Sequence, residues 1–333
     1  MIAGSIAGVS LVLSITITVV LLARDTGMDF SDLRLASEDG ASSSEEYFFP
    51  EIDRDAINRP QVADEGGLLR PPQRTNFLMV GLDNQLLTDA LMVGTFYRDT
   101  GDIHLMSIPR DMYTIIPPHR LDQMREDGIR IPSPVKINAF RAFGGRERGI
   151  YYLKAQLGEM LGVHFHYYIE VELSAFRRIV DAIDGVQMYI PRRLVYEDPC
   201  QNLFIDIPAG MQHLNGEMAE GVVRFRSFPT GDLARNNIQM EFMSQLIRQA
   251  LTREAIINDP LTLINIVLND VRTNVGLEVV RYLPFVTNVS ADSVTTFVMP
   301  GGGAYIGGVS WFMPNAQQLP EVINQVFFTD VLS

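Results

Sequence analysis

The longest uninterrupted apolar stretch lies at the start of the chain, from Ile2 to Ala23. As a helix rising about 1.5 Å per residue it would reach roughly 33 Å, enough to cross the hydrocarbon core of a bilayer. A buried helix of a soluble core normally carries a polar stripe, and the apolar part of a cleaved signal peptide is usually only about 7–15 residues long and follows a basic lead. We therefore predict a transmembrane helix over residues 1–23, although Arg24 beside Asp25 specifies its orientation only weakly.

A polar, acidic stretch follows, and it has the composition of a linker over residues 24–74. Between Arg24 and Gly66 there are 12 acidic and 4 basic residues, a net charge of −8. Prolines at positions 50, 60, 71 and 72 interrupt any regular element. Such a segment repels itself and stays extended, so we expect it to hold a domain away from the membrane.

From residue 75 onward, short apolar runs alternate with amphipathic stretches. We predict strands at 77–82, 90–97, 102–108, 164–172 and 186–190, and helices at 146–161, 174–183 and 235–255, followed by a helix–strand–helix set to residue 328. Ser174 is a plausible N-cap of its helix, and Gly185 stands where a helix C-terminus favours glycine. Strands interleaved with helices predict one layered α/β domain over 75–330.

The strands at 90–97 and 102–108 flank a turn at 98–101 and should form a β-hairpin. Residues that pair across it have numbers summing near 199, so Asp89 faces the region of Arg110 and Asp111. Two carboxylates and an arginine at one sheet end suit a divalent cation and phosphate, because Mg²⁺ prefers one or two carboxylates plus phosphate oxygens. The alternative is that both acids are ordinary turn or cap residues.

A second group of polar residues lies further along the chain. In an extended segment Arg224 and Arg226 would share a face, with Phe225 on the other side. Asp232, Arg235 and Gln239 follow at the start of the predicted long helix. Arginine forks bind phosphate oxygens in pairs, although a surface salt-bridge network is the common alternative. Lys136 adds weight to the phosphate interpretation, because it is one of only two lysines in the chain and stands between Val135 and Ile137.

Composition excludes several classes of protein. The chain has 27 basic and 40 acidic residues, net −13, so a broad basic surface and a nucleic-acid partner are not expected. Cys200 is the single cysteine, which excludes an intramolecular disulfide and a Cys-rich zinc site. The glycines at 301–303 and 307–308 are not followed by GKS or GKT, so we expect a mobile turn there and no phosphate-binding P-loop. The five histidines lack zinc-protease spacing, and those at 164 and 166 should lie on one strand face.

Taken together, these segments resemble the LytR-CpsA-Psr (LCP) family. The resemblance rests on FLMVGLD (77–83), TDALMV (88–93), LMSIPRDMY (105–113), KINAF (136–140), YYIEVELSAFRRIVDAIDGVQMYIP (167–191), GMQHLNGEMAEGVVRFR (210–226) and GDLARNNIQ (231–239), which occur in family order. It implies a single three-layer α/β/α domain with a central mixed sheet, outside the cytoplasm and anchored to the cell membrane by one helix. It also implies transfer of a glycopolymer from a polyprenyl-pyrophosphate carrier to peptidoglycan, with Mg²⁺, or Mn²⁺ in its place, and a hydrophobic groove for the lipid tail.

Carried over by position, the resemblance assigns Asp89 and Asp111 to the metal. It assigns the pyrophosphate to Arg110, Lys136, Arg224, Arg226, Arg235 and Gln239, and catalysis to Arg110, Asp232 and Arg235. The chain departs from the family at Leu87 and Ile238, where family members usually have arginine. An alternative function is therefore a catalytically weakened, carrier-binding scaffold or regulator of envelope assembly. A transcriptional role, a label often given to the family, has no helix-turn-helix or basic patch to support it.

Overall fold

The computed structural model describes residues 73–83, 88–199, 203–225, 232–250 and 289–328, together with 266, 269–275, 282 and 285. At 232–236 and at 291 only the backbone is described. The predicted transmembrane helix and nearly all of the predicted linker lie outside these residues. Within them, no helix is long and apolar enough to cross a membrane.

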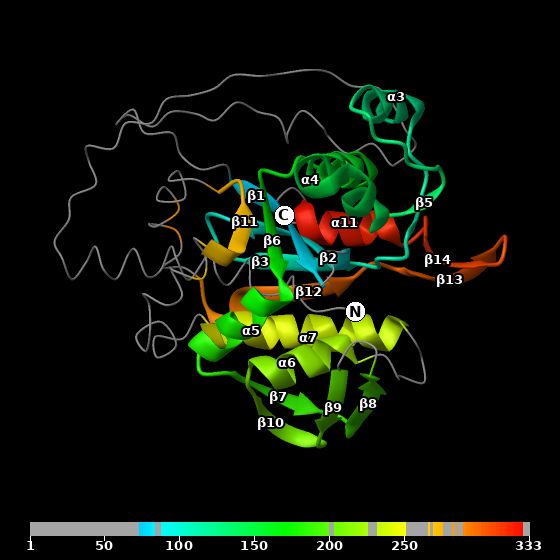
Figure 1. Ribbon diagram of the computed structural model, residues 1–333. Coiled ribbons are helices and arrows are strands. Elements are labelled where there is room, and N and C mark those ends of the chain that lie inside the picture. Colours follow the sequence, from blue (N-terminus) through cyan, green and yellow to red (C-terminus); the bar gives the residue numbers. More distant parts are fainter. Residues whose placement is uncertain are drawn as a thin grey trace, which may run out of the picture.

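A six-stranded mixed sheet forms the centre of the domain, as predicted (Figure 1). Its strands run in the order β11–β6–β1–β2–β3–β12. β1 is parallel to β6 and β3 is parallel to β12, while the other neighbours are antiparallel. The strands span Arg74–Leu82 (β1), Thr88–Tyr97 (β2), Ile103–Ile108 (β3), Tyr167–Glu172 (β6), Val271–Thr273 (β11) and Val294–Val298 (β12).

Helices cover both faces of this sheet and produce three layers (Figure 1). On one face lie α4 (Ala139–Leu161) and α11 (Leu319–Phe327), with α3 (Pro118–Glu126) beyond them. On the other lie α5 (Leu173–Ala182), α6 (Gly216–Arg224) and α7 (Asp232–Ala250). Alternation along β1 divides the core accordingly, since Leu78 and Val80 belong to the cluster under α4 and Phe77 and Met79 to the cluster under α5.

Four small two-stranded sheets complete the domain. They pair β4 (Tyr113–Thr114) with β5 (Val135–Lys136), β7 (Val186–Ile190) with β10 (Gly210–Leu214), β8 (Leu194–Asp198) with β9 (Leu203–Ile207), and β13 (Gly301–Ile306) with β14 (Val309–Pro314). A short 3-10 turn, η3, spans Ala291–Ser293.

Several local expectations need correction. The helix predicted at 146 begins at Ala139 and is interrupted at Gly145, whose φ of 68° lies in the left-handed region. Ser174 is not the N-cap of α5, because that position falls on Glu172, whose side chain forms no capping hydrogen bond. Gly185 does end its helix, with φ of 81° and its amide donating to the carbonyl of Val180.

The glycines near residue 300 do not form a simple turn. Gly301, Gly302 and Gly303 lie in strand β13, and only Gly307-Gly308, with φ of 60° and 78°, make the connection to β14. Positive φ at both central residues is the requirement of a two-residue hairpin turn of type I′. The prediction missed this hairpin because consecutive glycines have little strand propensity of their own.

Candidate functional site

The β2–β3 hairpin has the predicted register. Leu91 pairs with Ile108 and Phe96 with Ile103, so paired numbers sum to 199. Asp89 is buried at the start of β2, and Arg110 follows the end of β3. The Arg110 guanidinium donates through Nη1 to Oδ1 of Asp89. Sequence arithmetic therefore located this contact correctly.

Asp111 and Lys136 extend the group. Nζ of Lys136 lies 3.0 Å from Oδ1 of Asp111, and Nε of Arg110 lies 4.0 Å from Oδ2 of the same carboxylate. The short β4–β5 ladder, which pairs Tyr113 with Lys136, holds the lysine in place. Asp89, Arg110, Asp111 and Lys136, the acid–base cluster, thus form one connected set in which cations and carboxylates alternate.

Aromatic side chains border this cluster on one side. The Trp311 ring lies 5.9 Å from Nζ of Lys136 and edge-on to Tyr113, with centroids 5.1 Å apart. The next residue, Phe312, donates its amide to the carbonyl of Asp111 at 2.9 Å. Sequence reasoning missed Trp311 and Tyr113, although the single tryptophan of the chain in an uncharged stretch was a usable signal.

Arg224 and Gln239 belong to a second set of contacts, on α6 and α7. Arg224 is buried at the last position of α6 and bonds to Glu220 at 2.5 Å, while Glu220 also lies 3.3 Å from Nε of Arg177. Gln239 donates to the carbonyl of Val223 at 2.8 Å. The expectation of an extended segment at Arg224 was wrong, because the helical pattern of GEMAEGVV continues through it and only Phe225 turns extended.

Some of the predicted site residues lie outside the described part of the chain. Arg226 and Leu87 lie outside the described residues, and Asp232 and Arg235 lie in α7 without described side chains. Ile238 is 6% exposed and belongs to the apolar cluster under α5 and α7. The position where the family resemblance predicts arginine is thus part of the hydrophobic core here.

The donor set around Arg110 fits a hard divalent cation. Asp89 and Asp111 contribute carboxylates to one guanidinium, and Mg²⁺ commonly takes one or two carboxylates and completes its shell with phosphate and water. In the part of the chain that the structure describes, no group of three or more His, Cys, Asp or Glu side chains could hold a metal. A cation at this cluster would therefore depend on ligands supplied by a bound phosphate.

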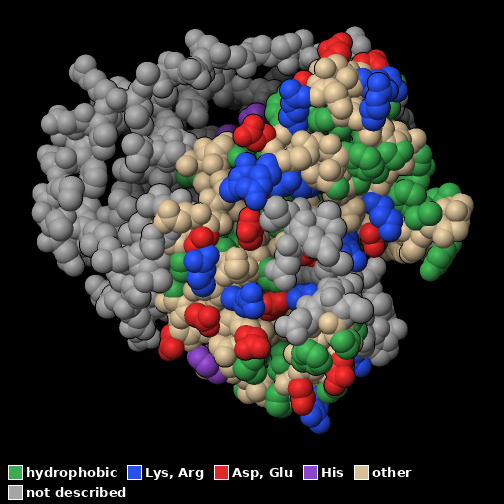
Figure 2. Space-filling view, in the orientation of Figure 1, with side chains coloured by type: hydrophobic (Ala, Val, Ile, Leu, Met, Phe, Trp, Pro, Cys, Tyr) green, Lys and Arg blue, Asp and Glu red, His purple; other side chains and the backbone are tan. Residues whose placement is uncertain are grey.

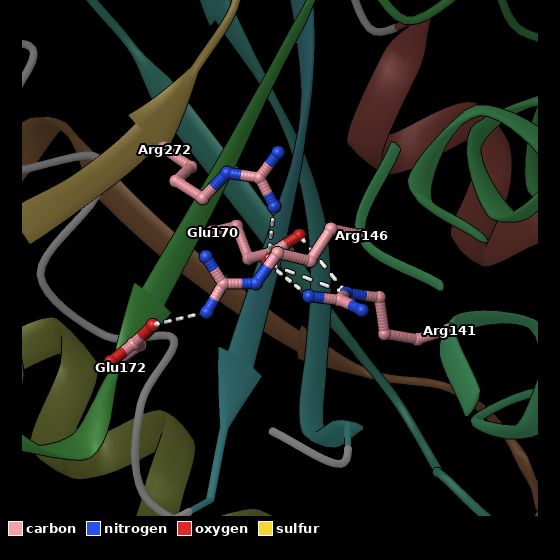
Figure 3. A network of polar contacts seen from close by, with 5 residues as sticks. All are labelled: Arg141, Arg146, Glu170, Glu172 and Arg272. Carbon is pink, nitrogen blue, oxygen red and sulfur yellow. Dashed lines mark hydrogen bonds and ion pairs between the residues drawn. The ribbon is translucent and has the colours of Figure 1, made fainter. Parts of the chain in front are cut away.

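A buried ion network lies on the face of the sheet that α4 covers, two strands away from β2 (Figure 3). Glu170 is 1% exposed and accepts hydrogen bonds from Arg141 at 2.9 Å and from Arg272 at 3.3 Å. Arg146 and Glu172 form a more exposed pair at 3.9 Å. Arg141 belongs to the first turn of α4, so the network joins the helix that follows Lys136 to the centre of the sheet. A glutamate between Ile169 and Val171 in a central strand was a sequence signal for such a partner.

Two histidines precede β6 and do not share its face, contrary to the prediction, because the strand begins only at Tyr167. Their rings are 5.3 Å apart, and the amide of Asn76 donates to Nδ1 of His166. Burial, and secondly the neighbouring His164, lower the pKa of His166 to about 4. His166 is therefore neutral at pH 7 and acts as an acceptor at the end of the sheet opposite the acid–base cluster.

A model of the LytR_cpsA_psr family matches residues 53–327. The chain belongs to the LytR_cpsA_psr family. It is 33% identical over 223 residues to the probable cell wall biosynthesis protein LcpB of Corynebacterium glutamicum, and the matching region covers 61% of this chain and 47% of LcpB. It is 27% identical over 259 residues to the polyisoprenyl-teichoic acid–peptidoglycan teichoic acid transferase TagT of Bacillus subtilis, covering 74% of this chain and 73% of TagT.

A further relative is the regulatory protein MsrR of Staphylococcus aureus, 26% identical over 206 residues, with 60% of this chain and 56% of MsrR covered. The chain thus spans about half the length of LcpB and of MsrR. Among solved structures, TagT bound to LIIa-WTA superposes with a TM-score of 0.61 at 24% identity, covering 81% of this chain and 95% of that one. TagV of B. subtilis has the same TM-score at 19% identity. These structures establish the LCP fold.

Proposed function

We propose that this family member is a membrane-anchored, Mg²⁺-dependent phosphotransferase. It would move a glycopolymer from a polyprenyl-pyrophosphate carrier to peptidoglycan at the outer face of the cell membrane. The acid–base cluster carries this proposal, because it places two carboxylates and two cations at the end of a family-type sheet. The similarity to TagT, whose name states a polyisoprenyl-linked donor and a peptidoglycan acceptor, supports the choice of substrates.

The chemistry that this requires is a phosphoryl transfer. An acceptor hydroxyl oxygen bonds to the phosphorus next to the glycan, the bond from that phosphorus to the bridging oxygen breaks, and polyprenyl phosphate leaves. A cation bound by Asp89 and Asp111 would neutralise charge on the phosphates. Arg110 and Lys136 would orient the pyrophosphate and stabilise the charge that develops on the leaving phosphate. Asp232 would accept the proton of the attacking hydroxyl.

The ion pairs of the acid–base cluster fit a role of this kind. Arg110 and Lys136 are each already paired with a carboxylate, so their charge is held in place before substrate arrives. Asp89 and Asp111 would hold the cation, which would supply positive charge beside the phosphates, and Arg110 would then donate to phosphate oxygens. The number of charge contacts would be conserved, so that little reorganisation would be needed at the moment of reaction.

The direct test measures release of polyprenyl phosphate from a lipid-linked glycan by the purified full chain in a bilayer. We expect Asp111→Ala to abolish release, while Asp122→Ala, at an exposed acid on α3, serves as a matched control with ordinary activity. Full activity of Asp111→Ala would refute the proposal. The two lysines allow a second comparison, in which Lys136→Gln lowers kcat/KM about 10- to 150-fold, the worth of one charge-assisted contact, and Lys154→Gln does not.

A carrier-binding scaffold with weak turnover is the second candidate. It is favoured by Ile238, which fills with apolar packing a position where the family resemblance predicts arginine. The two candidates differ in one measurement. A scaffold binds polyprenyl pyrophosphate tightly and releases little polyprenyl phosphate even with acceptor in excess, whereas an active enzyme turns over repeatedly. Leu87→Arg should raise turnover sharply in the scaffold and leave a fast wild-type enzyme unchanged.

A further inference from the structure

The β13–β14 hairpin leaves the sheet at the end of the strands where the acid–base cluster lies. β12 runs parallel to β3 and pairs Val298 with Ser107. The C-terminal ends of both strands therefore lie at the same end of the sheet, where Arg110 follows β3. The amide of Met299 donates to the carbonyl of Ser107 just before the hairpin begins. From there the two strands project away from the body of the domain (Figure 1).

The base of the hairpin, at Trp311 and Phe312, contacts the acid–base cluster and its neighbours. Phe312 donates its amide to the carbonyl of Asp111, and Trp311 contacts both Lys136 and Tyr113. Any force that positions the hairpin therefore also positions the cluster.

The outer part of the hairpin is apolar and exposed. Tyr305, Ile306 and Val309 are 82%, 47% and 42% exposed. Single exposed apolar residues are common, but here three gather around one tight turn, and hydrophobic side chains occupy the projecting end in Figure 2. Residues 299–314 contain no charged residue, in a chain with a net charge of −13. Ile306 and Val309 pair across the hairpin and share a face with Trp311.

A linker of the predicted kind before the domain would not orient this end of the sheet. β1 begins at Arg74, which pairs with Tyr97 at one end of the sheet, whereas Leu82 pairs with Thr88 at the cluster end. Fifty residues separate Ala23 from Arg74, and an extended linker of that length, up to roughly 165 Å, would let the domain take any orientation. A site that acts on a membrane-embedded carrier needs a second contact with the bilayer on its own side.

We propose that the tip of the β13–β14 hairpin inserts into the interfacial layer of the bilayer and holds the acid–base cluster at the depth of the lipid phosphates. The reason for needing this contact rests on the proposed function, whereas the insertion itself is tested independently of activity. Gly307 lies three positions after Ala304, about 10 Å along a strand, and apolar elements at membrane surfaces sit about 5–10 Å deep.

The choice of lipid over a glycan strand follows from the side chains present. Sugar recognition requires hydrogen-bonding groups beside the aromatic ring. At the tip, between Ala304 and Trp311, the only side chains with a polar atom are the Tyr305 and Ser310 hydroxyls, and the charged Lys136 beside Trp311 lies at the base of the hairpin. Tyrosine and tryptophan with aliphatic neighbours are instead the composition of a membrane interface. The acceptor glycan is therefore an alternative outcome of the test.

Trp311, the single tryptophan, is a built-in probe. The full chain is reconstituted in vesicles whose lipids carry bromine at shallow or deep acyl positions, and tryptophan emission is measured. We expect strong quenching by the shallow label and weaker quenching by the deep one. Moving the probe to the tip, with Tyr305→Trp and Trp311→Phe together, should increase quenching by the deep label. If neither the wild-type chain nor the Tyr305→Trp, Trp311→Phe variant is quenched, the proposal is wrong.

A triple variant, Tyr305→Ser, Ile306→Ser and Val309→Ser, provides the matched control. These side chains are exposed, so the thermal midpoint should stay unchanged while Trp311 quenching is lost. Carrier turnover in bilayers should fall at least about tenfold, the factor for losing the burial of one aliphatic side chain, and turnover of a short, water-soluble carrier should not change.

Further outcomes separate this proposal from the proposed function. Asp111→Asn should lose transfer and keep quenching. In the wild-type chain, transfer without quenching would refute only the hairpin insertion, and quenching without transfer would refute only the enzymatic function. If Trp311 emission responds to soluble glycan strands and not to brominated lipid, the hairpin binds the acceptor and the insertion is wrong.

Discussion

Replacing Glu170 with glutamine should destabilise the domain and, through α4, disturb the site. Glu170 is 1% exposed and accepts from both Nε and Nη2 of Arg141, whose side chain is 5% exposed. Glutamine keeps the volume and one acceptor but removes the charge. Arg141 is then left in the core with its charge uncompensated (Figure 3).

The size of the effect follows from burial. Removing one partner of a buried ion pair costs about 3–5 kcal/mol, and the retained amide oxygen recovers part of this, so we expect about 3 kcal/mol. Arg272 is 33% exposed, and its contact with Glu170 is screened by water, so Arg272→Gln should cost less than about 1 kcal/mol. For a domain of this size, 3 kcal/mol lowers the thermal midpoint by about 6 °C or more.

The assay is urea unfolding of the full chain in detergent, followed by far-UV circular dichroism. The double variant Glu170→Leu with Arg141→Leu should lie within about 1 kcal/mol of wild type, because an apolar pair of similar volume replaces a buried ion pair at little cost. If Glu170→Gln costs no more than Arg272→Gln, or if the double variant is as unstable as the sum of its single variants, the reasoning is refuted.

Other expected outcomes concern packing and pH. Gly94→Ala would place a Cβ 2.5 Å from the carbonyl oxygen of His104 in the β2–β3 ladder, so the free energy of unfolding in chemical denaturation should fall by about 3 kcal/mol. Gly303→Ala should leave stability unchanged, because its Cβ would have no atom within 4 Å. The folded-state pKa of His166 lies below its ordinary 6.5, so protonation of this side chain favours the unfolded chain. As pH falls from 6.5 to 4, the free energy of unfolding should therefore decrease by about 2 kcal/mol, a value that is discounted for the partial exposure of the ring. His166→Gln should flatten this dependence in thermal melts at several pH values, and an unchanged slope would contradict the assignment. Ile238→Arg should lower the thermal midpoint, because it buries a guanidinium among apolar side chains, and a variant as stable as wild type would show that the helix can rotate there.

Much of the fold could be predicted because its patterns are local. The apolar runs FLMVGL and ALMVGTFY predicted β1 and β2, and the turn at 98–101 set a register that placed Asp89 against Arg110. The contact of Asp111 with Lys136 was not deducible in this way, because it depends on a two-residue ladder between segments more than twenty residues apart.

Errors arose where tertiary contacts override local preference. Gly301 to Gly303 form a strand because β14 supplies the hydrogen bonds, although glycine alone disfavours strands. Arg224 stays helical because its contact with Glu220 lies one turn back, at i−4, which an alternating pattern of Arg, Phe and Arg does not reveal. The partner of Glu170 was equally hidden, since Arg141 stands 29 residues away.

The register of the β2–β3 hairpin has a consequence for the evolution of the chain. Asp89 meets Arg110 because nine residues of strand lead from it to the turn at Arg98, a distance of about 30 Å. A change of pairing by one residue would turn Asp89 to the opposite face of the sheet. Substitutions at Asp99 or Thr100 leave the pairing intact, but a single insertion or deletion there would separate the two charges. We therefore expect the length of this remote turn to be constrained as strictly as the charged residues, while its amino-acid identity varies.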